Sequence, residues 1–217
     1  MSVAHELRRA AAGVWAAQHA HPFVRGIGDG TLDEGRFRFY IRQDYVFLID
    51  YGRLLSLGAA RAPGLADMRR LAELAHAVLE TEMTLHRGLA ARWGVKAAEL
   101  DAESAAPATA AYTDFLLRTA ALGDFAELVA ALLPCMWGYA EIGERLAAAG
   151  PPEHAGYAAW IATYADPEFQ RLARWARELC DRAAAGAGPA ATARMHAAFR
   201  ASSEHELAFW ESAWRAA

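Results

Sequence analysis

The feature that most constrains the fold is residues 124–145, DFAELVAALLPCMWGYAEIGER. The aspartate that opens this stretch and Glu127 have the spacing of a capping box, which predicts that a helix begins there. Residues 128–140 carry no charge. Inside them, Pro134 removes a backbone donor and Gly138 costs about 1 kcal/mol of helix stability relative to alanine. We therefore expect a long apolar helix that is locally weakened and closely approached by another part of the chain at Gly138.

Cys135 and Tyr139 lie four residues apart in this stretch and therefore share one face of the expected helix. In one interpretation this thiol and phenol form the wall of a pocket in which Cys135 reacts. In the other, Cys135 only packs, since an unpaired cysteine is among the most buried residue types. The second cysteine, Cys180, lies near a helix end and is interpreted as a packing residue. Two cysteines do not make a disulfide framework for a chain of this length.

The rest of the chain is typical of an all-α protein. Hydrophobic residues make up 55% of it, and glycine and proline fall mostly between long periodic stretches. A chain of 217 residues fits one domain, so residues 1–217 are predicted to form a single helical domain. We expect about eight helices, with a loop over 21–32 and a second capping box formed by Thr31 and Glu34. The expected helices span residues 2–20, 33–62, 65–93, 108–122, 124–145, 153–164, 167–185 and 190–214.

Charge and hydropathy argue against several classes of partner. The formal net charge is −4, without the basic footprint of a nucleic-acid-binding protein. No apolar run approaches the roughly 20 residues of a membrane span, and Pro134 breaks the longest uncharged one. Residues 1–13 carry charges where the apolar core of a signal peptide would lie. A reduced, cytoplasmic setting is therefore expected.

Two carboxylates fall on apolar faces of the expected helices. Asp44 lies among aromatic residues that include Phe47 and Tyr51, and Glu206 shares a face with Phe209. Burying a carboxylate without a partner costs several kcal/mol. An ion pair to another helix would supply that partner for Asp44. Alternatively, Asp44 binds a polar heteroaromatic ligand held between Phe47, Tyr51 and facing aromatic side chains.

Six segments occur in an order that resembles the thiaminase II (TenA) family, from His21 to Trp210. They are HPFVRGIGDGTL, RFRFYIRQDY, YTDFLL, ALLPCMWGYAEIG, WIATYA and the closing E-x-x-F-W. The resemblance implies an all-α, heme-oxygenase-like (TenA/THI-4) fold without heme or another cofactor, usually in a homotetramer. It also implies an aminopyrimidine aminohydrolase of thiamin salvage, which releases ammonia from the 5-aminomethyl group of a 4-amino-2-methylpyrimidine. In this family the same site can split thiamin.

The resemblance also implies roles for individual residues. Cys135 resembles the nucleophile that adds as thiolate to the pyrimidine ring, and Glu206 the acid that protonates the leaving amine and then activates water. Asp44 matches the residue that pairs with the ring nitrogen and the exocyclic amine. The tyrosines that hold the ring and orient the thiol or Glu206 are Tyr112, Tyr139 and Tyr164. Phe47 falls where the family often has tyrosine, so it keeps the stacking contact and loses a hydroxyl.

Two other functions and the choice of substrate stay open at this stage. A metal-dependent oxygenase on the same fold could use Glu82 and His86, at i and i+4, with Glu141. Its remaining ligands would come from residues 167–182, which contain no histidine, so no metal site is predicted. A non-catalytic protein that binds thiamin or a pyrimidine would need neither a nucleophile nor an acid at these positions. The substrate could be the aminomethyl pyrimidine, its formylamino derivative or thiamin.

Overall fold

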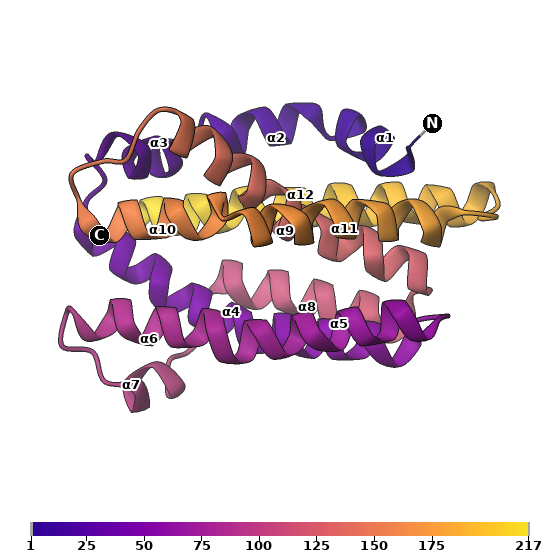
Figure 1. Cartoon of the computed structure of the whole chain (residues 1–217), viewed down its shortest axis with the longest axis horizontal. Coiled ribbons are helices and arrows are strands. Elements are labelled where there is room, and N and C mark those ends of the chain that lie inside the picture. The colour runs from indigo at the N-terminus through magenta and orange to yellow at the C-terminus, as the bar shows by residue number, and fades with distance from the viewer. Residues whose placement is uncertain (1, 217) are drawn as a thin grey trace.

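The computed structural model describes residues 2–216, and all regular secondary structure in that part of the chain is helical (Figure 1). This confirms the predicted all-α class. The elements, in chain order, are α1 (Val3–Ala10), α2 (Ala12–His19), α3 (Pro22–Asp29), α4 (Glu34–Arg61), α5 (Leu65–Ala77), the π-helical turn η1 (Val78–Glu82), α6 (Met83–Ala91), α7 (Ala97–Asp101), α8 (Pro107–Leu122), α9 (Phe125–Ala148), α10 (Ala155–Ala165), α11 (Pro167–Ala184) and α12 (Pro189–Arg215).

The predicted loop over residues 21–32 is wrong, because most of it forms α3. Pro22 occupies the first turn, where its missing N–H costs nothing, and His21 caps the helix by accepting from Phe23 N at 3.2 Å. Gly30 ends the helix in the left-handed region, with φ of 73°. The expected Thr31–Glu34 capping box is also wrong. The residue that caps α4 is Asp33, whose carboxylate accepts from Arg36 N.

The predicted helix over 65–93 is continuous but contains η1, a π-helical turn that its apolar period does not reveal. The expected helix over 2–20 divides into α1 and α2 at Ala11, and α7 forms inside the connector after Gly94. Gly94 itself has φ of 76°, as expected for a residue that follows a helix C-terminus. Glu82 is the last residue of this π turn.

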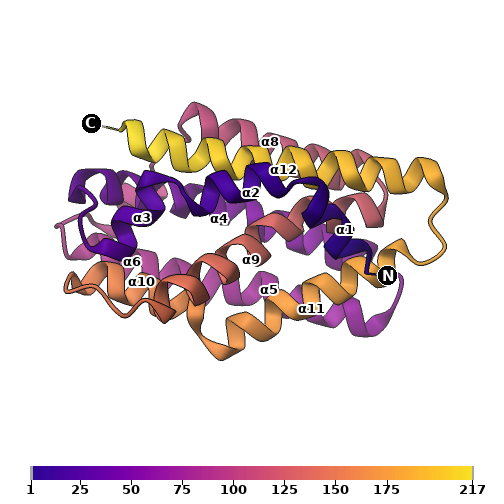
Figure 2. The same ribbon diagram turned by 90° about the horizontal axis from the view of Figure 1, so that it is seen from above.

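Helix α9 is the central element of the bundle. It packs against α4, α8, α10, α11 and α12. Helices α1–α3 lie on one side of it and α4–α8 on the other, and Figure 2 shows α9 crossing the middle of the molecule. Asp124 caps it by accepting from Glu127 N at 2.8 Å, which confirms the predicted start.

Helix α9 passes through Pro134 without ending, which confirms the continuous helix predicted over residues 124–145. By length and composition alone it could cross a membrane, but 78% of its most apolar window is buried inside the protein. Burial of this degree is typical of a core helix. The residues of α9 contribute to two apolar clusters, one around Trp15, Tyr51 and Leu132 and one around Tyr40, Trp160 and Trp210.

The close approach expected at Gly138 occurs instead at Gly143, on the same helix. A Cβ at Gly143 would lie 2.6 Å from the backbone carbon of Tyr164, whereas a Cβ at Gly138 would meet nothing nearer than Gln18 Oε1 at 3.7 Å. Gly143 therefore lets the end of α10 reach α9, and this contact sets the position of Tyr164.

We expect Gly143→Ala to lower the free energy of unfolding by about 1–3 kcal/mol, because the added methyl group forces two helix backbones apart. Gly138→Ala is the matched control and should be neutral or stabilising by up to ~1 kcal/mol, through helix propensity. Urea unfolding of both variants measures the difference. Equal effects at the two positions would contradict the close packing of α9 on α10.

Candidate active site

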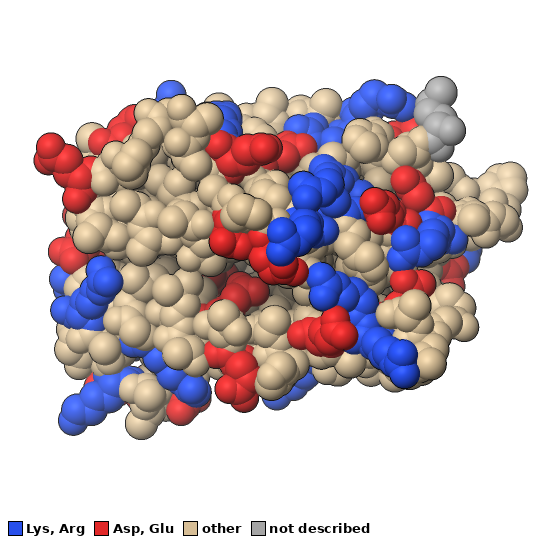
Figure 3. Space-filling view, in the orientation of Figure 1, with Lys and Arg blue, Asp and Glu red and all other residues tan. Residues whose placement is uncertain are grey.

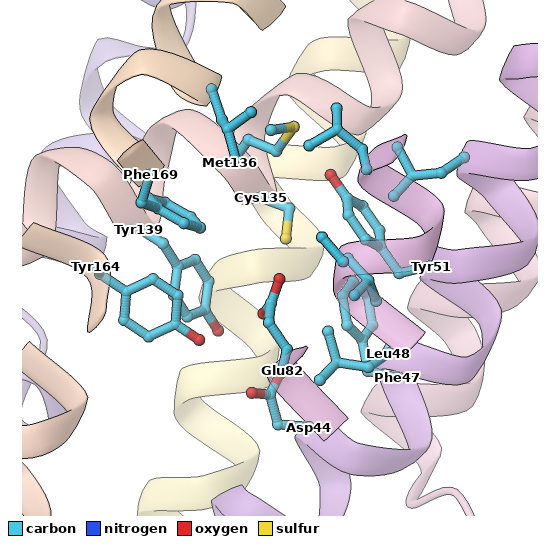
Figure 4. Close-up of a pocket in the computed structure, with 15 residues that line it drawn as sticks. Asp44, Phe47, Leu48, Tyr51, Glu82, Cys135, Met136, Tyr139, Tyr164 and Phe169 are labelled. Atoms are coloured by element: carbon cyan, nitrogen blue, oxygen red, sulfur yellow. The ribbon is translucent and has the colours of Figure 1, made fainter. Parts of the chain in front are cut away.

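A cavity of about 530 Å³, including its open mouth, lies among α4, α5, η1, α9, α10 and α11. Six predicted site residues line it: Asp44, Phe47, Tyr51, Cys135, Tyr139 and Tyr164. The other two, Tyr112 and Glu206, are buried and are not among the lining residues. Figure 4 shows Phe47 and Tyr51 on one side of the cavity and Tyr139 and Tyr164 on the opposite side, with the thiol of Cys135 pointing between them.

The aromatic walls leave a slot suited to a flat ring. Phe47 and Tyr51 are stacked, with ring centroids 5.5 Å apart and planes inclined by 23°. On the other side, the centroids of Tyr139 and Tyr164 are 4.8 Å apart. A planar heteroaromatic ligand in such a slot stacks on side chains from α4 and is held by phenols from α9 and α10.

Cys135 lies at the back of this slot, one helical turn before Tyr139, and is partly exposed to the cavity. Burial raises the pKa of its thiol well above the usual range, and the carboxylates of Glu206, Asp44 and Glu82 raise it further. A contact with the Tyr51 hydroxyl lowers this pKa without overcoming the rise. The resting thiol is therefore neutral, and its attack needs a nearby group that takes the proton.

Asp44 is held by contacts on one of its two oxygens. Its Oδ2 lies 2.7 Å from His86 Nε2 and accepts from the Tyr40 hydroxyl at 3.1 Å. The Tyr40 oxygen in turn accepts from Trp160 Nε1 at 3.2 Å. Among residues 2–216, no donor bonds Oδ1, the oxygen left for a ligand. The expected partner of Asp44 on another helix is therefore confirmed, whereas the binding of a ligand by Asp44 stays a prediction.

His86 carries a positive charge beside Asp44. Its Nδ1 lies 2.8 Å from the carbonyl oxygen of Glu82 and its Nε2 faces the carboxylate, so both ring nitrogens meet acceptors and both must be protonated. Burial is the largest single effect and lowers the pKa of His86, but the contacts with Asp44 and Glu82 together outweigh it and leave the pKa raised. Asp44 and His86 thus form a buried ion pair between α4 and α6.

Glu206 lies behind the cavity wall, at the end of a row of hydrogen-bonded hydroxyl groups. The Tyr112 hydroxyl lies 2.7 Å from Glu206 Oε1 and 2.8 Å from Ser202 Oγ. Ser202 gives its own proton to the carbonyl of Ala131 at 2.7 Å. The Tyr112 hydroxyl donates to Glu206, and this contact lowers the pKa of the carboxyl. Burial is the larger effect and raises the pKa of Glu206 to about 8.

This raised pKa predicts how stability depends on pH. Between pH 4.5 and about 8 the folded state keeps a proton on Glu206 that the unfolded state has lost. The free energy of unfolding must then fall as pH rises through this window. Between about pH 5 and pH 8 the wild type should lose roughly 2–4 kcal/mol more than Glu206→Gln. Urea unfolding at several pH values tests this, and parallel curves for the two proteins would refute it.

Five residues at the site were not predicted from the sequence as site residues: Tyr40, Glu82, His86, Phe169 and Ser202. Tyr40 precedes Asp44 by one helical turn, so the contact between them could have been predicted from their spacing in the sequence. His86 entered only the metal hypothesis, together with Glu82 and Glu141. Within residues 2–216 no group of three His, Cys, Asp or Glu side chains could hold a metal ion, and Glu141 instead pairs with Arg8 at 3.1 Å.

Comparison with known proteins places this geometry in a family. Residues 8–216 match the model of the TENA/THI-4/PQQC family. The chain is 42% identical to an aminopyrimidine aminohydrolase of Halalkalibacterium halodurans, over 99% of this chain and 96% of that protein.

Solved structures agree with this assignment and with the predicted fold. A TenA homologue from P. horikoshii OT3 superposes with a TM-score of 0.92 at 31% identity, covering 100% of both chains. A domain with a heme oxygenase-like fold from Shewanella denitrificans has a TM-score of 0.78 at 12% identity, covering 97% of this chain and 91% of that one. The second similarity concerns the fold alone.

Proposed function

The chain belongs to the TENA/THI-4/PQQC family, and we propose on this basis that it is an aminopyrimidine aminohydrolase of thiamin salvage. The reaction replaces the amino group on the 5-methylene of 4-amino-5-aminomethyl-2-methylpyrimidine by a hydroxyl group and releases ammonia. The observation that carries this proposal is the juxtaposition of Cys135 and Asp44 in one aromatic slot. Simple binding of a pyrimidine would not require a thiol at that point.

Asp44 and the aromatic walls bind the pyrimidine ring. The free Oδ1 accepts from the exocyclic amine, and the same carboxylate faces the ring nitrogen. The Asp44 carboxylate, paired with His86, can accept charge-assisted hydrogen bonds from the ligand. Phe47 stacks on the ring but has no hydroxyl. In this chain the hydroxyl that contacts the thiol on the α4 side of the slot belongs to Tyr51.

The chemical step uses Cys135 and Glu206 as a pair. In the ionised fraction of Glu206, the carboxylate takes the thiol proton as sulfur bonds to a ring carbon, and the carbon–nitrogen bond at the methylene then breaks. Glu206 passes that proton to the departing ammonia, takes one from water as the oxygen bonds to the methylene, and returns it to the sulfur as the thiolate leaves the ring. A carboxyl with a pKa of about 8 suits both transfers near neutral pH. The overall balance is amine plus water to alcohol plus ammonia.

Hydrolysis in ¹⁸O-labelled water tests this reaction. We expect the hydroxymethyl pyrimidine to carry one ¹⁸O atom in its new hydroxyl group, as read by mass spectrometry, with one ammonia formed per pyrimidine. A product without label, or pyrimidine consumed without ammonia, would rule out hydrolysis at the methylene.

We also propose that the protein is cytoplasmic and assembles as a homotetramer. Large apolar side chains stay exposed along α4, η1 and α8, where an apolar groove includes Leu57, Leu79 and Leu117. Burying such a surface against another copy is favourable. Light scattering measures the mass directly, and a monomer at micromolar concentration would contradict the tetramer.

A further inference from the structure

Glu82 is a cavity residue to which the proposed mechanism gives no role. It ends η1, and π-helical turns are rare elements that occur frequently at functional sites. Figure 4 shows its carboxylate pointing into the slot, between Asp44 and the thiol of Cys135. No hydrogen bond or ion pair to this carboxylate exists within residues 2–216. The turn thus places an acid beside the reacting groups without giving it a protein partner.

Glu82 also lies at the mouth of the cavity. It lines both the slot and an outer groove between η1 and α10–α11, and Ala77, Phe169 and Leu172 are shared by the two as well. Figure 3 shows a hollow on this face, between the α5–α6 layer and the α10–α11 layer, with acidic side chains at its floor and edge. A substrate that enters here, and an amine that leaves here, passes the Glu82 carboxylate.

The charges inside the cavity compensate Glu82 only in part, because His86 lowers the pKa of its carboxyl and Asp44 opposes this effect. Asp44 and His86 cancel as an ion pair, and Glu206 is neutral because it is protonated. Cys135 faces Glu82 from α9 as a neutral thiol, and Tyr51 and Tyr164 face it as neutral phenols. Burial raises the pKa of Glu82 to about 7, so a substantial fraction is ionised at neutral pH. A cation bound beside Glu82 would offset the unfavourable burial of its negative charge.

We propose that Glu82 binds the positively charged leaving group of the substrate, so that the site selects pyrimidines with a cationic substituent over neutral ones. This inference rests on the proposed aminohydrolase function and extends it to the substrate. The aminomethyl pyrimidine carries an ammonium group near neutral pH and thiamin carries a thiazolium group, whereas the formylamino derivative is neutral. Glu82 therefore favours the first two, and the neutral hydroxymethyl product leaves more readily than the substrate.

Binding measurements with two ligands that differ only in this substituent test the proposal. They use the Cys135→Ser background, where substrate is not consumed, slightly above neutral pH. Glu82→Gln should weaken the aminomethyl pyrimidine about tenfold or more, while the affinity for the hydroxymethyl pyrimidine stays within about twofold. Glu80→Gln is the matched control, since Glu80 is exposed on the same π turn, and it should change neither affinity. Glu82→Asp keeps the charge and should recover part of the selectivity.

Kinetics in the active protein provide a second readout. Glu82→Gln should raise KM for the aminomethyl pyrimidine about tenfold and leave kcat within a few-fold, because the contact forms already on binding. Equal weakening of both ligands, or no weakening of either, would overturn the role of Glu82. Failure of the aminohydrolase proposal has a different signature, which is the absence of ammonia from the wild type whatever the ligand selectivity.

Discussion

Cys135→Ser should lower kcat by roughly 10³-fold or more, because a serine hydroxyl is a far weaker acid and nucleophile than a thiol. The fold should survive, since the two side chains have similar volumes and Cys135 is only partly buried. Ligand binding should survive as well, because Asp44 and the aromatic walls are untouched. Chromatographic detection of the hydroxymethyl pyrimidine measures turnover, and a thermal shift with the same ligand measures binding.

Cys180→Ser is the matched control for this experiment. Cys180 is fully buried in α11 and belongs to the apolar core, away from the slot. We expect this variant to keep its kcat, with any loss confined to stability. A Cys135→Ser protein that turns over substrate at the wild-type rate would show that the thiol only packs. One that fails to fold would show a structural role for Cys135.

Glu206→Gln should lower kcat by about 10²–10⁴-fold, because glutamine can neither take the thiol proton nor pass it to the leaving amine. Its shape and the contact with Tyr112 are largely retained, so substrate affinity should change little. The same variant is expected to be more stable than the wild type at high pH. Loss of activity combined with a gain in stability would show that Glu206 acts in catalysis and does not stabilise the fold.

The matched control is Glu204→Gln, two residues earlier on α12. Glu204 is solvent-exposed and pairs with Arg200 at 2.9 Å. Glu204→Gln makes the same side-chain change away from the cavity, and the kcat of this variant should equal that of the wild type. Steady-state kinetics on both variants make the comparison. Equal effects at 204 and 206 would remove Glu206 from the mechanism.

Local patterns in the sequence predicted much of this fold. The start of α9 could be read from Asp124 and Glu127, because a helix cap involves residues three apart. Asp44 could be placed on an apolar face because that face repeats every three or four residues. Helix α3 escaped the same argument, since its short length and the three glycines of residues 21–32 suggested a loop.

The contacts that give the site its chemistry could not be read in this way. His86 meets Asp44, and Tyr112 meets Glu206, across 42 and 94 positions of sequence. No spacing rule connects residues so far apart. Glu82 faces the cavity because a π turn rotates the chain by part of a turn, and an apolar period of 3.6 residues does not reveal such a turn. The resemblance to the family supplied the roles of Cys135 and Glu206, and their geometry came only with the folded chain.

The most direct test of the central claim is ammonia release from the purified wild-type protein given 4-amino-5-aminomethyl-2-methylpyrimidine. We predict many turnovers, with one ammonia for each pyrimidine converted. No ammonia, together with a ligand-induced rise in the melting temperature, would contradict the claim and make the protein a pyrimidine-binding protein. No ammonia and no thermal shift would mean that this pyrimidine is not its ligand.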